Sequence, residues 1–136
     1  MNLLVIDGQG GQLGSSIIKA VTERFPDVNI TAVGTNANAT ASMVKAGAKK
    51  AATGENPVVV ASLKADIIIG PVGIVIADAL LGEITPRMAE AVGKSGAVRI
   101  LIPMNKCDSI IAGVPDAPVS AIIEDALKKL SVIIGK

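Results

Sequence analysis

The sequence predicts one doubly wound α/β domain of three layers, with a mostly parallel sheet of about five or six strands. Three observations favour this fold class. Short aliphatic runs alternate with helical patterns along all 136 residues. The runs are continuous rather than alternating, as in strands covered on both faces. A glycine cluster follows the first run, where many nucleotide-binding domains of this class bind phosphate. At this length we expect a single domain over residues 1–136.

The first half of the chain contains three predicted strands, each followed by a predicted helix. The strands span residues 2–6, 28–33 and 48–52. The first helix has apolar residues at helical spacing from Leu13 to Phe25, and Pro26 ends it. Asn36 or Asn38 caps the second helix, which runs through Ala46.

The second half continues the same alternation. A third helix over residues 55–63 carries Pro57 in its first turn, where the missing N–H costs nothing. Further strands are expected at residues 65–69 and 98–102, with a weaker edge strand at 109–112. Further helices are expected at 72–81, from Thr85-Pro86 to Gly93, and at 117–132.

Composition excludes several kinds of chemistry. The chain has no His, Trp or Tyr and a single Phe. Ser-His-Asp and Cys-His catalysis are therefore excluded, as is a metal site built on imidazole, and no metal is expected. A stacking platform for single-stranded nucleic acid needs several aromatic rings. The net charge of +1 is spread along the chain without a basic cluster, so no nucleic-acid partner is expected.

The start of the chain shows no targeting segment. Residues 1–6 lead directly to Asp7, without the basic region and apolar stretch of a signal peptide. The most apolar window, residues 67–81, is short and is interrupted by Pro71 and Asp78. The lone Cys107 excludes an intramolecular disulfide. We therefore expect a cytoplasmic protein with no membrane partner.

The glycine cluster is the most informative motif. Its residues match the spacing Gly8-x-x-Gly11-x-x-Gly14, as in extended short-chain reductases, and also Gly8-x-Gly10-x-x-x-Gly14. Leu13 occupies the third glycine position of the usual G-x-G-x-x-G fingerprint, which is therefore absent. Glycine amides and the following helix N-terminus favour a phosphate ligand. The alternative is a tight turn that only packs the helix against the sheet.

Two features argue against standard dinucleotide binding. The acidic residue that normally contacts the ribose of NAD is expected about 20 positions beyond the loop. Thr35 and Asn36 stand there instead; they offer hydrogen bonds to a ribose or phosphate, and no Arg accompanies them. Asp7 would repel phosphate unless it turned away or were bridged by Mg²⁺. The expected ligand is therefore NAD(P), another nucleotide or another phosphorylated metabolite.

A second loop, Gly70-Pro71-Val72-Gly73, follows the fourth strand. In a sheet of order 3-2-1-4-5 the first and fourth strands are neighbours, and the crevice between their carboxyl ends is the topological switch point. Both loops would then face one crevice, although the second is equally typical of an ordinary turn. The predicted binding residues are Gly8, Gln9, Gly10, Gly11, Gln12, Leu13, Gly14, Thr35, Asn36, Gly70, Pro71, Val72 and Gly73.

Few residues offer reactive groups near strand ends. The catalytic candidates are Asp7, Glu55, Glu83, Lys106 and Cys107, with Asn105 beside the last two. A thiolate of Cys107 activated by Lys106 competes with a simpler reading, a small buried apolar side chain. Glu55 also suits a first helical turn, and Glu83 a loop.

Several motifs together resemble a small bacterial family of unknown function. They are residues 6–11, 33–36, 52–56, 70–73, 81–86 and 102–107, and they span nearly the whole chain. The resemblance implies a Rossmann-like α/β protein, mostly from anaerobic bacteria, and it supplies no activity or catalytic residue.

Three functions remain open on the sequence. The first is a nucleotide- or dinucleotide-binding domain that takes its second wall from another protomer. The second is a non-enzymatic sensor of a small phosphorylated or carboxylated metabolite. The third is an assembly protein, since 50% hydrophobic content in a small domain favours self-association. A homo-oligomer, with a dimer favoured, is expected in each case.

Overall fold

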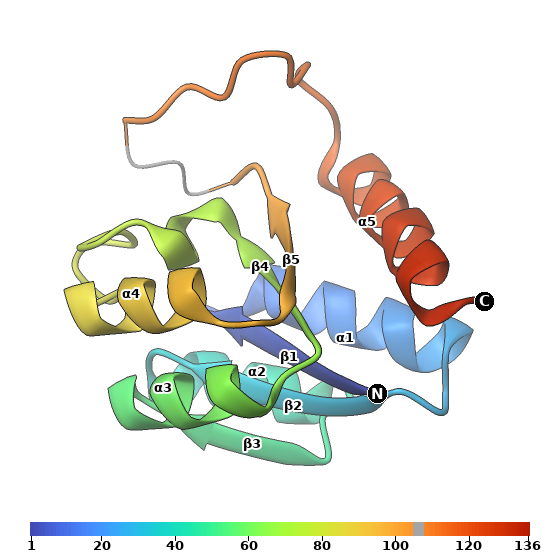
Figure 1. Cartoon of the computed structure of the whole chain (residues 1–136), viewed down its shortest axis with the longest axis horizontal. Coiled ribbons are helices and arrows are strands. Elements are labelled where there is room, and N and C mark those ends of the chain that lie inside the picture. Colours follow the sequence, from blue (N-terminus) through green and yellow to red (C-terminus); the bar gives the residue numbers. More distant parts are fainter. Residues whose placement is uncertain (105–107) are drawn as a thin grey trace.

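The computed structural model describes residues 1–104 and 108–136, which form a sheet covered by helices on both faces (Figure 1). The strands are β1 (Asn2–Asp7), β2 (Asn29–Gly34), β3 (Lys50–Thr53), β4 (Ile67–Pro71) and β5 (Val98–Ile102). All pair in parallel, in the order β3-β2-β1-β4-β5. The helices are α1 (Gln12–Arg24), α2 (Ala37–Lys45), α3 (Glu55–Lys64), η1 (Val72–Val75), α4 (Pro86–Lys94) and α5 (Val119–Ile134). The predicted fold class is confirmed.

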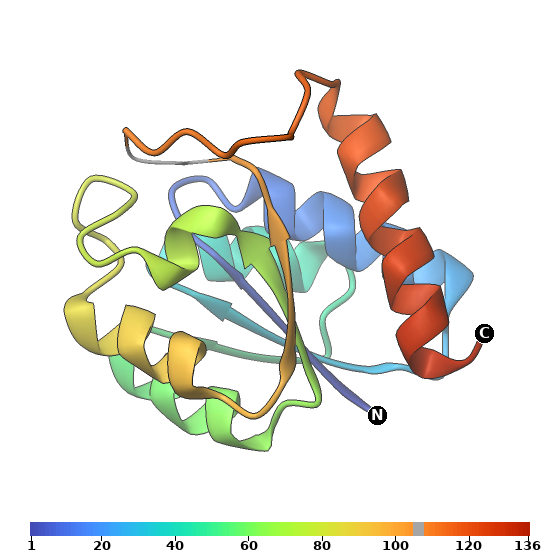
Figure 2. The same cartoon turned by 45° about the horizontal axis from the view of Figure 1, so that its top comes forward.

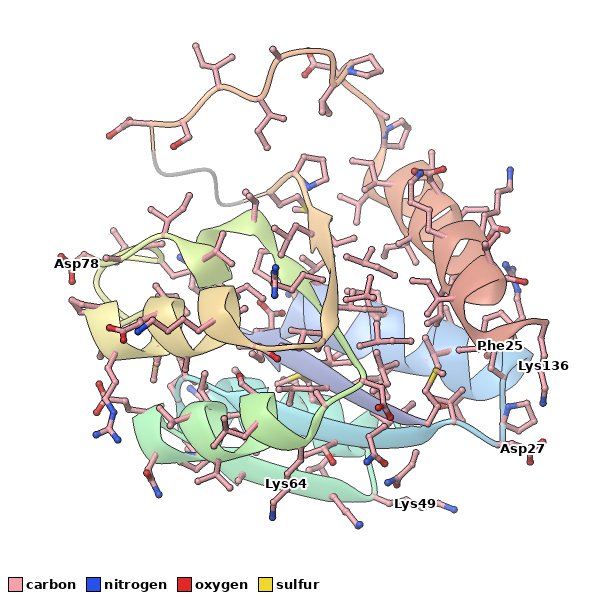
Figure 3. The ribbon with its side chains drawn as sticks, in the orientation of Figure 1. Phe25, Asp27, Lys49, Lys64, Asp78 and Lys136 are labelled. Atoms are coloured by element: carbon pink, nitrogen blue, oxygen red, sulfur yellow. The ribbon has the colours of Figure 1, made fainter. Side chains whose placement is uncertain are left out.

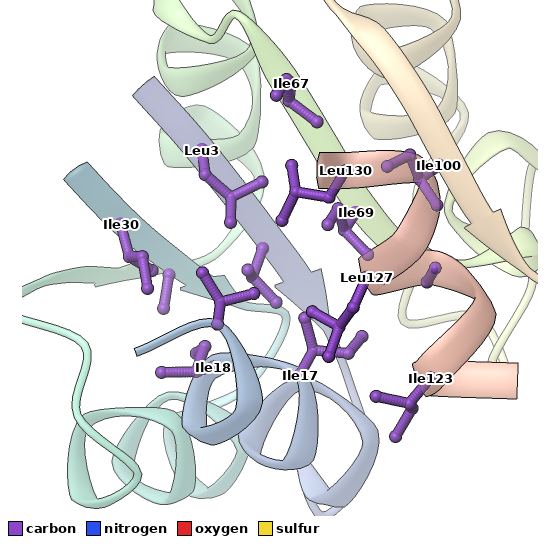
Figure 4. Packing of buried hydrophobic residues seen from close by; sticks show 14 of the residues in the cluster. Leu3, Ile17, Ile18, Ile30, Ile67, Ile69, Ile100, Ile123, Leu127 and Leu130 are labelled. Carbon is purple, nitrogen blue, oxygen red and sulfur yellow. The ribbon is translucent and has the colours of Figure 1, made fainter. Parts of the chain in front are cut away.

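Two hydrophobic clusters hold the three layers together. Alternate residues of each central strand point to opposite faces, so that Leu3 belongs to one cluster and Leu4 to the other. The first cluster joins the sheet to α1, α2 and α5; Figure 4 shows Ile17 of α1 and Leu127 of α5 against the strands. The second cluster joins the other face to α3, η1 and α4. Figure 2 shows these helices on the side away from α1 and α5.

Both ends of the sheet are easily identified. β1 runs from the N-terminus (Figure 1) toward the side on which Asp78 lies, whereas Asp27 and Lys136 lie at the opposite end of the molecule (Figure 3). There Lys136 Nζ lies 3.6 Å from Asp27 Oδ2, an exposed ion pair. The carboxyl ends of the strands, where ligands bind in open α/β sheets, are therefore at the Asp78 end.

Two predicted elements were wrong. Of the helix expected at residues 72–81, only the 3₁₀ turn η1 forms, and tight turns follow it. Asp78, Leu80 and Leu81 have φ values of 65°, 56° and 56°, which no right-handed helix contains. These turns bury Leu80 and Ile84 against the second cluster, so tertiary packing overrides the local apolar pattern.

The weak strand expected at residues 109–112 is also absent from the described part of the chain. Those residues form loop and turn, and Ile110 is 95% exposed. The β5 edge is left without a sixth strand, so the aliphatic composition of the run does not by itself produce pairing. Among residues 1–104 and 108–136, no helix has the length and apolarity needed to span a bilayer.

Candidate functional site

Asp7 ends β1 at the centre of the switch point, but its carboxylate points into the protein. The residue is 3% exposed. Its oxygens accept hydrogen bonds from the N–H of Gly8 at 2.8 Å and of Gly14 at 2.7 Å. Burial raises the pKa of Asp7, the two N–H groups oppose that rise, and the nearby charge of Glu83 adds to it. Asp7 thus turns away from the crevice and closes the glycine loop onto α1.

Three of the loop glycines are required by packing. A Cβ on Gly8 would lie 2.6 Å from Thr35 Oγ1, and a Cβ on Gly14 would lie 2.6 Å from Met43 Sδ. Gly11 has a φ of 72° and would meet the backbone of Ala39 at 2.7 Å. The spacing of these three glycines therefore lets β1, α1 and α2 approach closely, which is the packing alternative raised by the sequence.

Gly10 differs from its neighbours. A Cβ there would meet only Gln12 Cγ, at 4.0 Å, and its φ lies outside the left-handed range. Gly10 and Gln12 are both exposed, and within the described chain neither N–H has a hydrogen-bond partner. Gln12 begins α1, which has no side-chain cap and no acidic residue in its first turn. Free amides and a positive helix end suit an anion.

Glu83 is brought to the glycine loop from the turns between η1 and α4. Its Oε1 accepts hydrogen bonds from Gln9 N at 2.8 Å, Thr35 Oγ1 at 2.5 Å and Asn36 Nδ2 at 2.9 Å. Partial burial raises the pKa of Glu83, but these three hydrogen bonds outweigh it, so the pKa lies below its ordinary value. Glu83 is therefore an ionised carboxylate at neutral pH.

Asn36 and Thr35 link the end of β2 to the glycine loop. Asn36 Oδ1 accepts from Ala39 N at 2.9 Å and caps α2, as the sequence predicts. Its Nδ2 also donates to Gln9 O at 3.0 Å. Thr35 N donates to Asp7 O at 3.0 Å. The ends of β1 and β2 and the Glu83 turn thus form one hydrogen-bonded group.

The second loop lies beside the first, as the strand order predicts. β4 pairs with β1, and a Cβ on Gly70 would lie 2.5 Å from the carbonyl oxygen of Ile6. Gly70, Pro71 and Gly73 are buried, and Val72 is half-buried. The loop therefore lies beside the glycine loop at the carboxyl ends of β1 and β4, and Val72 is its most accessible residue.

The remaining candidates lie apart or outside the described residues. Glu55, in the first turn of α3, accepts a hydrogen bond from Thr85 Oγ1 at 2.6 Å, which ties α3 to the start of α4. Asn105, Lys106 and Cys107 lie outside the residues that the structure describes. Within the described ranges, no three His, Cys, Asp or Glu residues gather as metal ligands.

The signal that was missed is the contact between Glu83 and the glycine loop. The sequence indicates Glu83 as a catalytic candidate or a loop carboxylate, and not as a partner of the glycine loop. Its partners Gln9 and Thr35 lie 74 and 48 positions away, so no local motif records their proximity.

Fold and site together define an α/β protein of the Rossmann type, with a glycine loop at the switch point of a five-stranded parallel sheet. Over residues 2–135 the sequence matches the family described as "Domain of unknown function (DUF3842)", and the chain belongs to this family. The expected membership of a family of unknown function is thereby confirmed.

Comparison with solved structures supports the same fold. A dodecameric FMN-dependent Ubix-like decarboxylase from Escherichia coli O157:H7 has 20% sequence identity and a TM-score of 0.50, over 96% of this chain and 76% of that chain. At this identity the likeness concerns the fold alone. Comparison with curated proteins found no match.

Proposed function

We propose that the protein binds a nucleotide or a related phosphorylated ligand at the carboxyl ends of β1, β2 and β4, with a phosphate on the amides of Gly10 and Gln12. Gly10 carries the proposal. It is an exposed loop glycine that the packing of the fold does not require, and a residue without a side chain lets a phosphate approach the backbone amides closely. Because the Asp7 carboxylate points into the protein and binds the amides of Gly8 and Gly14, it does not face the proposed phosphate as the sequence suggested it would.

Three features favour a mononucleotide as the ligand. The amides at the start of α1 favour an anion. No Arg lies at the end of β2 to accommodate the 2′-phosphate of NADP, where Thr35 and Asn36 stand. The structurally similar decarboxylase depends on FMN, a mononucleotide. We therefore propose a mononucleotide such as FMN or AMP, with NAD as the second candidate.

A Gly10→Ala variant tests where the phosphate binds. Calorimetric titration with FMN, AMP, NAD⁺ and NADP⁺ at millimolar concentration should give binding of at least one compound to the wild type. In Gly10→Ala that binding should weaken about tenfold, because the new methyl group obstructs the approach to the amide. The free energy of unfolding should change by less than about 0.5 kcal/mol.

Gly96→Ala is the matched control, because a Cβ at Gly96 meets nothing within 4 Å and the φ of Gly96, like that of Gly10, lies outside the left-handed range. Its binding should equal that of the wild type. No binding of any of the four compounds to the wild type would overturn the proposed function. Unchanged binding in Gly10→Ala would place the phosphate elsewhere.

We also propose that the protein forms a homo-oligomer, and that β5 faces a second copy. The two edges of the sheet differ. β3 is four residues long and carries Lys50, with Lys49 just before it, which protects an edge against pairing. β5 is apolar apart from Arg99, and Val98 is 50% exposed. The Arg99 guanidinium donates a hydrogen bond to the carbonyl of Ser95 at 2.8 Å, so its charge does not protect the β5 edge against pairing with another chain.

A large apolar hollow adjoins the β5 edge. It measures about 920 Å³ and lies between β5, residues 111–117 and α5, with Ile122 and Ile133 in its lining. Ile110, on the same linker, is 95% exposed. Exposed apolar surface at β5, in the hollow and at Ile110 favours burial against a second copy of the chain.

Val98→Lys tests the interface, since it gives β5 the charge that protects β3. Sedimentation velocity should show a wild-type dimer at micromolar concentration, and Val98→Lys should raise the dissociation constant at least about tenfold. Val60→Lys is the control, because Val60 is 41% exposed near the β3 edge. A monomeric wild type, or equal dissociation in both variants, would contradict the assignment of this face.

A further inference from the structure

Glu83 takes the place of a carboxylate that the chain lacks at the end of β2. In dinucleotide-binding domains of this topology an acidic residue at that point contacts the ribose hydroxyls. Here β2 is followed by Thr35 and Asn36. Both donate to Glu83 Oε1, at 2.5 Å and 2.9 Å, so a carboxylate from a distant turn lies against the end of β2.

Glu83 is held in one orientation. Three donors converge on Oε1, whereas Oε2 has no hydrogen-bond partner within the described chain. The turn that presents Glu83 is closed by hydrogen bonds from Asp78 N to Ile84 O at 2.7 Å and from Ile84 N to Ala79 O at 3.1 Å. Ile84 is 1% exposed and anchors the turn in the second cluster. The carboxylate is thus held in one orientation, and its Oε2 atom can accept a hydrogen bond from a ligand.

The chemistry of that oxygen restricts its ligand. An ionised carboxylate only accepts hydrogen bonds, so it binds hydroxyl donors and repels phosphate. The free amides of Gly10 and Gln12 lie beyond Gln9 in the same loop, whereas the amide of Gln9 itself is already bound to Glu83. The glycine loop therefore offers an anion site at Gly10 and Gln12, and the Glu83 carboxylate bound to the same loop offers a hydroxyl acceptor beside it.

We propose that Glu83 recognises the free ribose hydroxyls of the bound nucleotide, through Oε2. This inference rests on the proposed function and narrows it to ribonucleotides whose 2′-hydroxyl is unmodified. Thr35 and Asn36 are positioning residues that hold Oε1, and the ligand contact belongs to Glu83. A 2′-deoxy ligand loses the hydrogen bond, and a 2′-phosphate meets a like charge.

The test compares AMP with 2′-deoxy-AMP by calorimetric titration. The wild type should bind AMP about tenfold more tightly, since a hydrogen bond to a charged group is lost in the analogue. Glu83→Gln should bind AMP more weakly and should distinguish the two compounds less, because a neutral amide makes a weaker hydrogen bond to the 2′-hydroxyl than a carboxylate does. The control Glu90→Gln, on the exposed face of α4, should keep the wild-type ratio.

Substitutions at Thr35 test whether its hydroxyl positions the Glu83 carboxylate, separately from any effect on folding. Thr35→Ser keeps the hydroxyl that donates to Glu83 and should keep the ratio between AMP and 2′-deoxy-AMP. Thr35→Val removes the hydroxyl and should lower that ratio. Thermal unfolding followed by circular dichroism identifies any variant that is not folded at the titration temperature. If Thr35→Val is not folded, the ratio measured for Thr35→Ser is compared with the ratio for Glu83→Gln instead.

Each other outcome has a definite meaning. Equal binding of the two compounds to the wild type overturns the role of Glu83 and leaves the proposed function standing. So does binding of FMN without binding of AMP. Tighter AMP binding by Glu83→Gln would overturn it as well, because the carboxylate would then compete with phosphate for the Gln9 amide. No binding of any nucleotide overturns both proposals.

Discussion

Asp7→Ala should lower the free energy of unfolding by about 3 kcal/mol, because two N–H groups then lose their acceptor in a closed part of the fold. The Gly8 and Gly14 amides both lie on buried residues, so water cannot readily replace the carboxylate. Urea denaturation followed by far-ultraviolet circular dichroism, at one fixed protein concentration, measures the change. The chain lacks Trp and Tyr, which rules out the usual fluorescence signal.

Two further variants make the Asp7 result specific. Asp7→Asn keeps one acceptor oxygen but turns an amide N–H toward the second donor, so it should lose about half as much stability. Asp27→Ala removes an exposed carboxylate from its ion pair with Lys136 and should change stability by less than about 0.5 kcal/mol. Equal losses for Asp7→Ala and Asp27→Ala would show that the glycine loop does not depend on Asp7.

The pH dependence of the same comparison has a definite sign. The pKa of Asp7 is raised above 3.8 in the folded state, so the native protein binds this proton more tightly than the unfolded chain does. Its contribution to stability is therefore greatest below 3.8 and falls as pH rises through the folded pKa. The stability advantage of the wild type over Asp7→Asn should shrink over that interval. The pKa of Glu83 is lowered in the folded state, so its contribution to stability is present above pH 4.5 and is lost as the pH falls through the folded pKa.

The sheet was predictable from sequence because its determinants are local. Continuous aliphatic runs such as residues 67–69 are buried on both faces of a parallel sheet, and Pro26 and Thr85 mark helix boundaries by their own chemistry. The segment after η1 could not be predicted in this way. Leu80 and Ile84 are apolar at nearly helical spacing, but they reach the core through turns with positive φ, which only the surrounding packing selects.

In the candidate site too, features set by neighbouring residues were predictable and features set by distant residues were not. The glycine loop and its place after β1 were predictable, because spacing within a few residues defines them. The separate roles of Gly10 and Gly14 were not, since they depend on whether Met43 of α2 lies within reach of a Cβ. The position of Glu83 depends on the whole path of the chain between β4 and α4. Local patterns therefore predicted the glycine loop at the carboxyl end of β1, and long-range contacts determine which chemical groups lie beside it.

Gly70→Ala should also lower the free energy of unfolding, by about 3 kcal/mol, because the new Cβ would lie 2.5 Å from the backbone carbonyl of Ile6. Backbone cannot rotate aside as a side chain does, so β1 and β4 must separate at their carboxyl ends. Both crevice loops follow these strand ends directly. The variant should therefore weaken nucleotide binding as well as stability, although Gly70 itself is buried and contributes no side chain.

The matched control for Gly70→Ala is Gly93→Ala on α4. A Cβ there meets nothing within 4 Å, and Ala is the better helix former, so this variant should gain up to about 1 kcal/mol. Urea denaturation of both variants against the wild type should thus give shifts of opposite sign. A Gly70→Ala protein as stable as the wild type would mean that β1 and β4 can separate freely. The carboxyl ends of these strands would then not hold Glu83 and the free amides of the glycine loop in fixed positions.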